Sequence, residues 1–71
     1  DVNNANEDGW TALIHACRND HHQCVQLLLD CGADVNCADK RGQSALIFAC
    51  RNGHYQCAQL LLDYGADVNW N

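Results

Sequence analysis

The chain has 71 residues, of which 48% are hydrophobic and 18% are charged, a composition typical of one small globular domain. Its net charge of -5 argues against general binding to the phosphate backbone of nucleic acids. No apolar run approaches the roughly 18 residues of a membrane span, and the first residues lack the pattern of a secretory signal peptide. We therefore expect an intracellular protein, cytoplasmic or nuclear, that binds neither nucleic acid nor a membrane.

The sequence repeats itself with a period of 33 residues. Residues 1–38 and 34–71, aligned with this shift, are identical at 25 of 38 positions. A repeat of this length is typical of stacked arrays, in which each copy forms one small supersecondary unit. The sequence therefore predicts two similar units packed side by side in one continuous array.

Each repeat begins with a short predicted helix, which spans about residues 11–19 in the first copy. The hydroxyl of Thr11 is well placed to cap this helix, and Ser44 is well placed to do the same in the second copy. With a rotation of 100° per residue, one side of the helix carries Leu13, Ile14, Ala16 and Cys17. We expect this side to be buried and the side with His15, Arg18 and Asn19 to be exposed.

A second helix is predicted over about residues 22–31. Its inner side is expected to hold Cys24, Val25, Leu27, Leu28 and Cys31, while its glutamines and Asp30 point away. Gly32 supplies a residue that can adopt the left-handed conformation and so end the helix. An extended segment at residues 33–36 then leads to a turn at residues 39–42.

The chain contains six cysteines, a density close to that of small disulfide-stabilised secreted domains. Cys17 and Cys50 are 33 residues apart, as are Cys24 and Cys57, so the two pairs mark equivalent positions in the repeats. All four lie in apolar helical patterns. We interpret them as buried, reduced thiols of an intracellular protein, with a disulfide framework as the alternative.

Two motifs occur in both copies. In the first copy they read Gly9-x-Thr11-Ala12-Leu13-x-x-Ala16-Cys17 and Leu27-Leu28-Leu29-x-x-Gly32-Ala33-Asp34-Val35-Asn36. They resemble the ankyrin repeat family. This resemblance implies an all-α solenoid of helix-turn-helix repeats with β-turn or hairpin connections. In the family's frame, residues 1–5 end a preceding repeat, and residues 6–38 and 39–71 are full repeats.

The sequence departs from the family pattern at two places. The family's usual Thr-Pro-Leu-His is replaced by Thr11-Ala12-Leu13-Ile14 and Ser44-Ala45-Leu46-Ile47. The proline that presets the first helical turn is therefore missing, as is the histidine that bonds to the threonine hydroxyl. The glycine between the two helices is kept as Gly53 but is Asp20 in the first repeat. These changes concern the rigidity of the helix starts and leave the expected fold unchanged.

The resemblance implies a protein-binding scaffold with no catalytic activity and no cofactor. Members of the family contact protein partners through the turn tips and the exposed side of the first helix of each repeat. The matching residues here are Glu7, Asp8, Trp10, Arg18 and Asn19 in the first repeat, and Lys40, Arg41, Gln43, Arg51 and Asn52 in the second. Helical phase adds His15 and Phe48. The tips differ between the copies while the apolar positions repeat, as independent tuning of a binding surface would produce.

These residues also have purely structural alternatives. Trp10 and Phe48 would shield a neighbouring helix if they do not contact a partner. Arg18 and Arg51 would be solvated or would pair with nearby carboxylates. An acidic tip beside a basic tip would equally form an ion pair between the repeats. Such exposed pairs contribute only about 0–1 kcal/mol.

Metal binding and catalysis are weaker hypotheses. Cys17, His21, His22 and Cys24 fall within eight residues, but a zinc site needs four converging ligands, and these side chains belong to different helical faces. The second repeat has Tyr55 in place of His22. We expect no metal site; zinc uptake sensitive to loss of His22 would indicate the Cys/His alternative. The sequence also lacks a phosphate-binding glycine loop and a nucleophile motif, so we expect no enzyme.

Two asparagines are candidates for modification. Asn36 and Asn69 each follow a leucine, Leu28 and Leu61, by eight residues, which resembles the asparaginyl hydroxylation context of this family. The structural alternative is that each asparagine fastens the turn with its side chain.

Both ends of the chain fall inside the Asp-Val-Asn segment and neither repeat has a polar cap. Terminal repeats of a solenoid usually carry such caps. The alternative to binding a foreign protein is therefore a self-associating fragment, or a designed repeat scaffold without a native partner.

Overall fold

The computed structural model describes residues 1–68, which form four short α-helices. Helices α1 (Ala12–Arg18) and α2 (His22–Asp30) belong to the first repeat, and α3 (Ala45–Arg51) and α4 (Tyr55–Asp63) belong to the second. The all-α fold of helix-turn-helix repeats is thus confirmed. No helix in this part of the chain is both long and apolar enough to cross a membrane.

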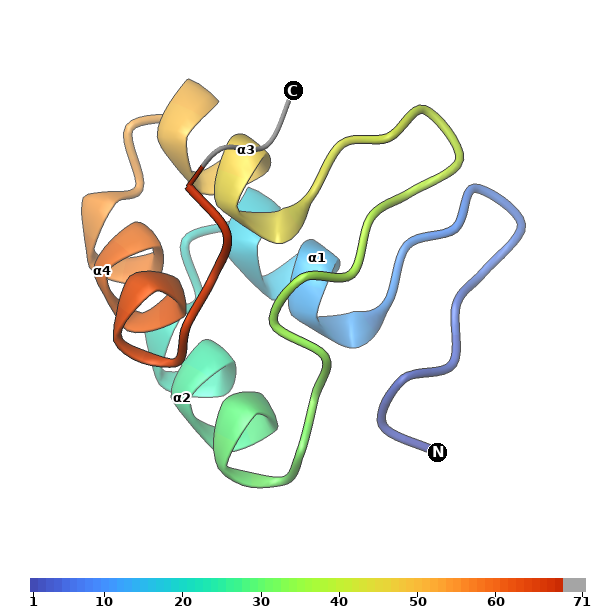
Figure 1. Ribbon diagram of the computed structural model, residues 1–71, viewed down its shortest axis with the longest axis horizontal. Helices are drawn as coiled ribbons and strands as arrows, with labels where there is room; N and C mark the ends of the chain where they lie inside the picture. The colour runs from blue at the N-terminus through green and yellow to red at the C-terminus, as the bar shows by residue number, and fades with distance from the viewer. Residues whose placement is uncertain (69–71) are drawn as a thin grey trace.

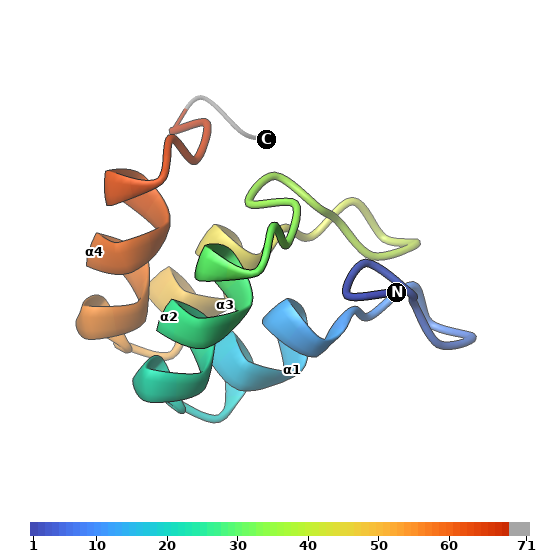
Figure 2. The same ribbon diagram turned by 90° about the horizontal axis from the view of Figure 1, so that it is seen from below.

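The helices form two layers (Figures 1 and 2). Helix α1 packs against α2 and α3 packs against α4, while α1 contacts α3 and α2 contacts α4 between the repeats. A hairpin-like loop precedes each first helix and is closed by an isolated antiparallel bridge, Ala5 with Thr11 and Ala38 with Ser44. The two loops lie side by side and project from the same side of the helices. This arrangement brings equivalent turn tips next to each other.

The helix starts are capped as the sequence predicts, even without proline. The Ile14 N–H donates to Oγ1 of Thr11 at 3.4 Å, and the Ile47 N–H donates to Oγ of Ser44 at 3.2 Å. Each bond satisfies one of the backbone donors that a helix leaves free at its start. In place of the family's histidine, Sγ of Cys37 lies 3.3 Å from the Thr11 hydroxyl.

The turn between the two helices of each repeat needs a left-handed residue. Gly53 adopts a φ of 71° there, and Asp20, its equivalent, adopts 59°. A left-handed conformation costs a non-glycine residue about 1 kcal/mol, although aspartate tolerates it better than most. Asp20 therefore forms the same turn as Gly53, but with local strain in the first repeat.

Polar side chains join the two repeats as well. The carbonyl oxygen of Cys17, at the end of α1, accepts a hydrogen bond of 2.8 Å from Nδ1 of His54. Because a carbonyl only accepts, this ring nitrogen carries the proton. The Tyr64 hydroxyl donates to the Asp30 carboxylate, which ties the end of α4 to the end of α2. These bonds fix the position of one repeat against the other.

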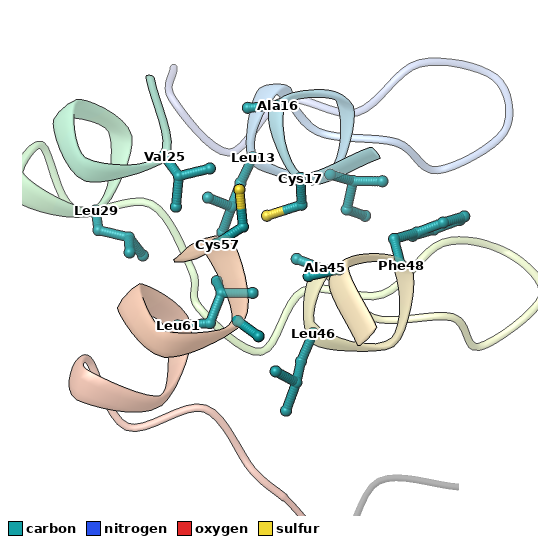
Figure 3. Packing of buried hydrophobic residues seen from close by; sticks show 13 residues of the cluster. Leu13, Ala16, Cys17, Val25, Leu29, Ala45, Leu46, Phe48, Cys57 and Leu61 are labelled. Carbon is teal, nitrogen blue, oxygen red and sulfur yellow. The ribbon is translucent and has the colours of Figure 1, made fainter. Parts of the chain in front are cut away.

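The core lies between the two repeats and includes two cysteines (Figure 3). Its largest fully buried side chains are Leu13, Ile14, Leu61, Val25, Cys17 and Cys57. Burial raises the pKa of Cys17 to about 12, with the nearby Cys57 adding to the effect. Burial, together with the adjacent Asp20 carboxylate, raises the pKa of Cys57 to about 11. Both thiols are therefore protonated and act as small apolar side chains.

The prediction of which residues form the buried side of the second helix was wrong in part. Val25 and Leu29 are buried in α2, whereas Cys24, Leu27 and Cys31 are exposed. The helix contacts α1 on one side and α4 on another, and Leu29 rather than Leu27 faces these neighbours. The expectation that all four repeated thiols are buried was also wrong, because Cys50 is exposed like Cys24. All six cysteines are free.

Candidate functional site

Each turn tip is shaped by one polar side chain at its start. Oδ1 of Asn6 accepts from the backbone N–H groups two and four residues later, at 2.9 and 3.0 Å. Oδ1 of Asp39, the equivalent residue, accepts from the corresponding pair at 2.9 and 2.8 Å. These bonds close the turn around Asn6 and the turn around Asp39 in the same way. Both tips are therefore held in a defined shape before any partner binds.

The two tips contact each other through hydrogen bonds. The backbone N–H of Lys40 donates to the carbonyl oxygen of Asp8 at 3.1 Å. The indole Nε1–H of Trp10 donates to Oδ2 of Asp39 at 3.0 Å. No ion pair joins the tips within residues 1–68, so backbone and indole donors take the place of the acidic–basic pair considered from the sequence.

The carboxyl group of Asp39 is the centre of this contact. Burial alone would raise its pKa, but hydrogen bonds from the backbone N–H of Gln43, the Trp10 indole and the backbone N–H of Arg41, together with the Arg41 charge, lower the pKa below its usual range. The group therefore stays ionised and accepts from three donors. Sequence analysis placed Asp39 in the turn but missed this role. The available signal was its alignment with Asn6, since both side chains can close the same type of turn.

Gly9 allows the tips to approach closely. A Cβ atom at this position would lie 2.8 Å from the backbone nitrogen of Lys40 and 3.1 Å from Cα of Asp39. Gly9 also has a φ of 82°, which an L-residue with a side chain adopts at a cost. The glycine is therefore required both by its backbone conformation and by the contact with the next repeat.

Behind the tips lies a stack of aromatic and cationic side chains. The guanidinium carbon of Arg18 lies 4.2 Å from the centre of the Trp10 ring and 5.8 Å from that of Phe48. The Trp10 ring forms T-shaped pairs with the rings of Phe48 and His15, at 5.8 and 5.2 Å between ring centres. The expectation from helical phase that Phe48 is exposed was wrong. Only 7% of its surface is accessible, because Trp10 and Arg18 cover it.

These elements enclose an open hollow of about 500 Å³, which we call the tip hollow. It lies between the two turn tips and the facing sides of α1 and α3, and its lining residues are Asp8, Trp10, Arg18, Asp39, Lys40, Arg41, Gln43, Phe48 and Arg51. Eight of the twelve residues predicted to contact a partner are therefore brought together in one place. The ninth lining residue, Asp39, was identified only from the structure.

The remaining four predicted residues lie elsewhere. Glu7 is exposed at the first tip. Asn19 and Asn52 donate from their side-chain amides to the carbonyl oxygens of His15 and Phe48, at 2.8 and 2.9 Å, so they satisfy the ends of α1 and α3. His15 and Asn19 line a second hollow, at the open side of the first repeat. Helix-end hydrogen bonding thus accounts for the two asparagines.

The asparagines considered for hydroxylation have a structural role where the structure describes them. Asn36 is exposed, and its Oδ1 accepts from the backbone N–H of Asp67 at 2.8 Å. Asn3, one repeat earlier, accepts from Asp34 in the same way at 2.7 Å. Asn69 lies outside the described residues. Hydroxylation of Asn36 and Asn69 stays a prediction.

The cluster considered for zinc does not converge. Within residues 1–68, no group of three or more His, Cys, Asp or Glu side chains is placed to hold a metal ion. Cys17 is buried in the core while Cys24 and His21 are exposed. Nδ1 of His22 is buried without a hydrogen-bond partner.

Comparison with known proteins agrees with this architecture. The pattern of ankyrin repeats, in three copies, matches residues 1–71. Over 33 residues the chain is 52% identical to the NAD-capped RNA hydrolase NUDT12 of Homo sapiens, and equally to those of Pongo abelii and Macaca fascicularis. This segment is 46% of the chain and only 7% of each relative. The chain belongs to the ankyrin repeat family, whose repeats generally act as protein–protein interaction modules.

Proposed function

We propose that this chain binds a protein partner through the tip hollow. The observation that carries the proposal is the convergence of both turn tips with the facing sides of α1 and α3 around one open space. Its base contains Trp10, Phe48 and Arg18, and aromatic and arginine side chains are the types most often found at the energetic centre of protein interfaces.

The tip hollow is well ordered without a partner. Asn6 and Asp39 hold the tips through paired backbone bonds, and the Trp10 indole is fixed by its bond to Asp39. Side chains that are already fixed lose little conformational entropy on binding, so more of the contact energy appears as affinity. This preorganisation supports a binding role.

We propose no catalytic activity for the chain. The buried thiols of Cys17 and Cys57 have raised pKa values, which is the opposite of an activated nucleophile. The hydrolase activity in the name of the three relatives belongs to proteins of which the matched segment forms 7%. That activity is not proposed here.

A peptide-display selection tests the proposed binding site. A random peptide library is selected on the whole chain, and each selected peptide is then measured against Arg51→Ala in the tip hollow and Gln23→Ala on the exposed side of α2. We expect binding to weaken with Arg51→Ala and to stay unchanged with Gln23→Ala. Selected peptides that bind both variants like the parent chain would contradict the proposal.

Self-association is a second candidate, and one observation favours it. An apolar hollow of about 580 Å³, which we call the end groove, is lined by Ala12, His15, Ala16, Asn19, His21, Cys24, Leu27 and Leu28. The equivalent residues 33 positions later include Ala45, Ala49, Cys57 and Leu61, which are fully buried in the core shared by the two repeats. Cys57 is fully buried there, whereas Cys24 is exposed, and Leu27 is 64% exposed.

The opposite face of the molecule supplies the matching surface. Ile14, Cys17 and Leu29 are buried in the core cluster that also contains residues of the second repeat. Their equivalents are less covered: Cys50 is exposed and Leu62 is 41% exposed. A second copy of the chain would therefore fit its second repeat onto the end groove as the two repeats fit each other, in a head-to-tail contact that can continue.

Sedimentation velocity under reducing conditions tests this contact. Leu27→Lys places a charge in the end groove, and Gln23→Lys places the same charge elsewhere on α2. We expect the sedimentation coefficient of the parent chain to increase with concentration. The Gln23→Lys variant should show the same increase, and the Leu27→Lys variant should not. A parent chain that stays monomeric at high concentration would contradict self-association and leave the tip hollow unaffected.

A further inference from the structure

All the basic side chains of this acidic chain lie around the tip hollow. The sequence contains four lysines and arginines against nine aspartates and glutamates. The four are Arg18, Lys40, Arg41 and Arg51, and each of them lines the hollow. They come from α1, the second tip and α3, so folding alone brings them together. Two acidic residues, Asp8 and Asp39, share the lining.

These four charges are available to a partner. None of them forms an ion pair within residues 1–68. Arg18 is held over the Trp10 ring, which leaves the N–H groups at the edge of its guanidinium free to bond. Asp39 already accepts from two backbone N–H groups and the Trp10 indole, although its charge still acts on Arg41. The hollow is therefore a cationic patch on a protein that is otherwise negative.

We propose that the tip hollow recognises an acidic peptide segment, one that presents several aspartate or glutamate side chains to these four cations. The inference rests on the proposed function and specifies its partner. Complementary charge steers such a segment to the hollow and disfavours basic ones. A protein segment fits better than nucleic acid, because a net charge of -5 repels a long polyanion and leaves a short acidic stretch as the better match.

The experiment uses four ten-residue probes on the whole chain. Three are peptides in which serine alternates with one other residue, which is glutamate, glutamine or lysine. The fourth is a single-stranded thymidine oligonucleotide. Binding is followed by NMR, with the Trp10 indole N–H as the reporter inside the hollow. We expect the glutamate peptide alone to shift this signal and those of the two tips. The shifts should vanish at about 0.5 M salt, because screening is then strong.

Two variants and a matched control locate the effect. Arg51→Gln and Lys40→Gln each remove one charge from the hollow, and both side chains are exposed. Gln56→Glu, on the exposed side of α4, changes the net charge by the same amount, from -5 to -6. We expect each hollow variant to weaken binding about twofold to fivefold. The control should leave binding unchanged. Equal weakening by Gln56→Glu would overturn the inference, because net charge alone would then explain the binding.

The remaining outcomes separate the inference from the proposed function. Absence of shifts with the glutamate peptide at about 1 mM overturns the inference. Binding of the glutamine or lysine peptide in the hollow at equal affinity also overturns it, but it leaves the proposed protein-binding role intact. If the oligonucleotide binds more tightly than the glutamate peptide, the inference is overturned and nucleic acid becomes the preferred ligand of the tip hollow. Failure of the proposed function is recognised separately, when the peptides from the display selection do not depend on Arg51.

Discussion

The Nε1–H of Trp10 donates a 3.0 Å hydrogen bond to Oδ2 of Asp39, a residue 29 positions later in the chain. This bond links the first turn tip to the second and fixes the indole ring on which Arg18 lies. The acceptor is a partly buried carboxylate that also shapes its own tip through two backbone bonds. This side-chain contact therefore both joins the two tips and holds the indole ring at the base of the tip hollow.

Replacing Trp10 by phenylalanine should destabilise the chain. An aromatic ring is kept at this position, but the hydrogen bond to the Asp39 carboxylate is lost, and a hydrogen bond to a charged acceptor contributes about 1.5–3 kcal/mol. The free energy of unfolding is measured by urea denaturation with far-UV circular dichroism. In a chain that already carries Asp39→Asn, the same change should cost less, since the two residues act together. An equal cost in both backgrounds would contradict a direct interaction.

Acid should remove the contribution of Asp39 to stability. Its pKa is lowered in the folded chain, so its contribution is fully present above the unfolded pKa of about 3.9. It is then lost as the pH falls through the lower folded value. Unfolding free energies between pH 6 and pH 2.5 should therefore decrease more steeply for the parent chain than for Asp39→Asn. Parallel curves would show that Asp39 is not stabilised in its ionised form.

Gly9→Ala should cost more stability than Gly42→Ala, its equivalent in the second repeat. Both glycines have a positive φ, 82° and 78°, so both substitutions carry the same conformational cost of about 1 kcal/mol. A Cβ at Gly9 also meets the backbone of Lys40 at 2.8 Å, whereas a Cβ at Gly42 meets no atom within 4 Å. Thermal melts of the two variants compare these costs directly. Equal melting temperatures would mean that the tips separate without penalty.

The cysteines should divide into reactive and protected groups under native alkylation. Cys24, Cys31 and Cys50 are exposed, while Cys17 and Cys57 are buried with pKa values raised to about 12 and 11. Because the thiolate is the reactive form, the buried pair should stay unmodified at pH 8 until the chain unfolds. Peptide mass spectrometry after iodoacetamide treatment, with and without urea, measures this. Early labelling of Cys57 would show that the two repeats separate readily.

The sequence predicts most of the residues that belong to the tip hollow but not how they are arranged in space. Seven of its nine lining residues follow from the resemblance to the family's repeat, which indicates the positions in the tips and the first helix, and helical phase adds Phe48. The gathering of all four cations does not follow, since Arg18 and Lys40 lie 22 positions apart and meet only when the repeats stack. The roles of Asn19 and Asn52 were also missed, because a helix-end hydrogen bond depends on side-chain rotamers.

What the sequence determined by itself is the local structure: four helices, their Thr11 and Ser44 caps, and the turns between them, all set by interactions over a few residues. What only the tertiary structure decided is which equivalent residues are buried. Cys17 and Cys50 occupy nearly identical local sequences, yet the first is fully buried and the second exposed. The difference arises because a second repeat packs on the first, and burial is a property of that neighbour and not of the helix that carries the residue.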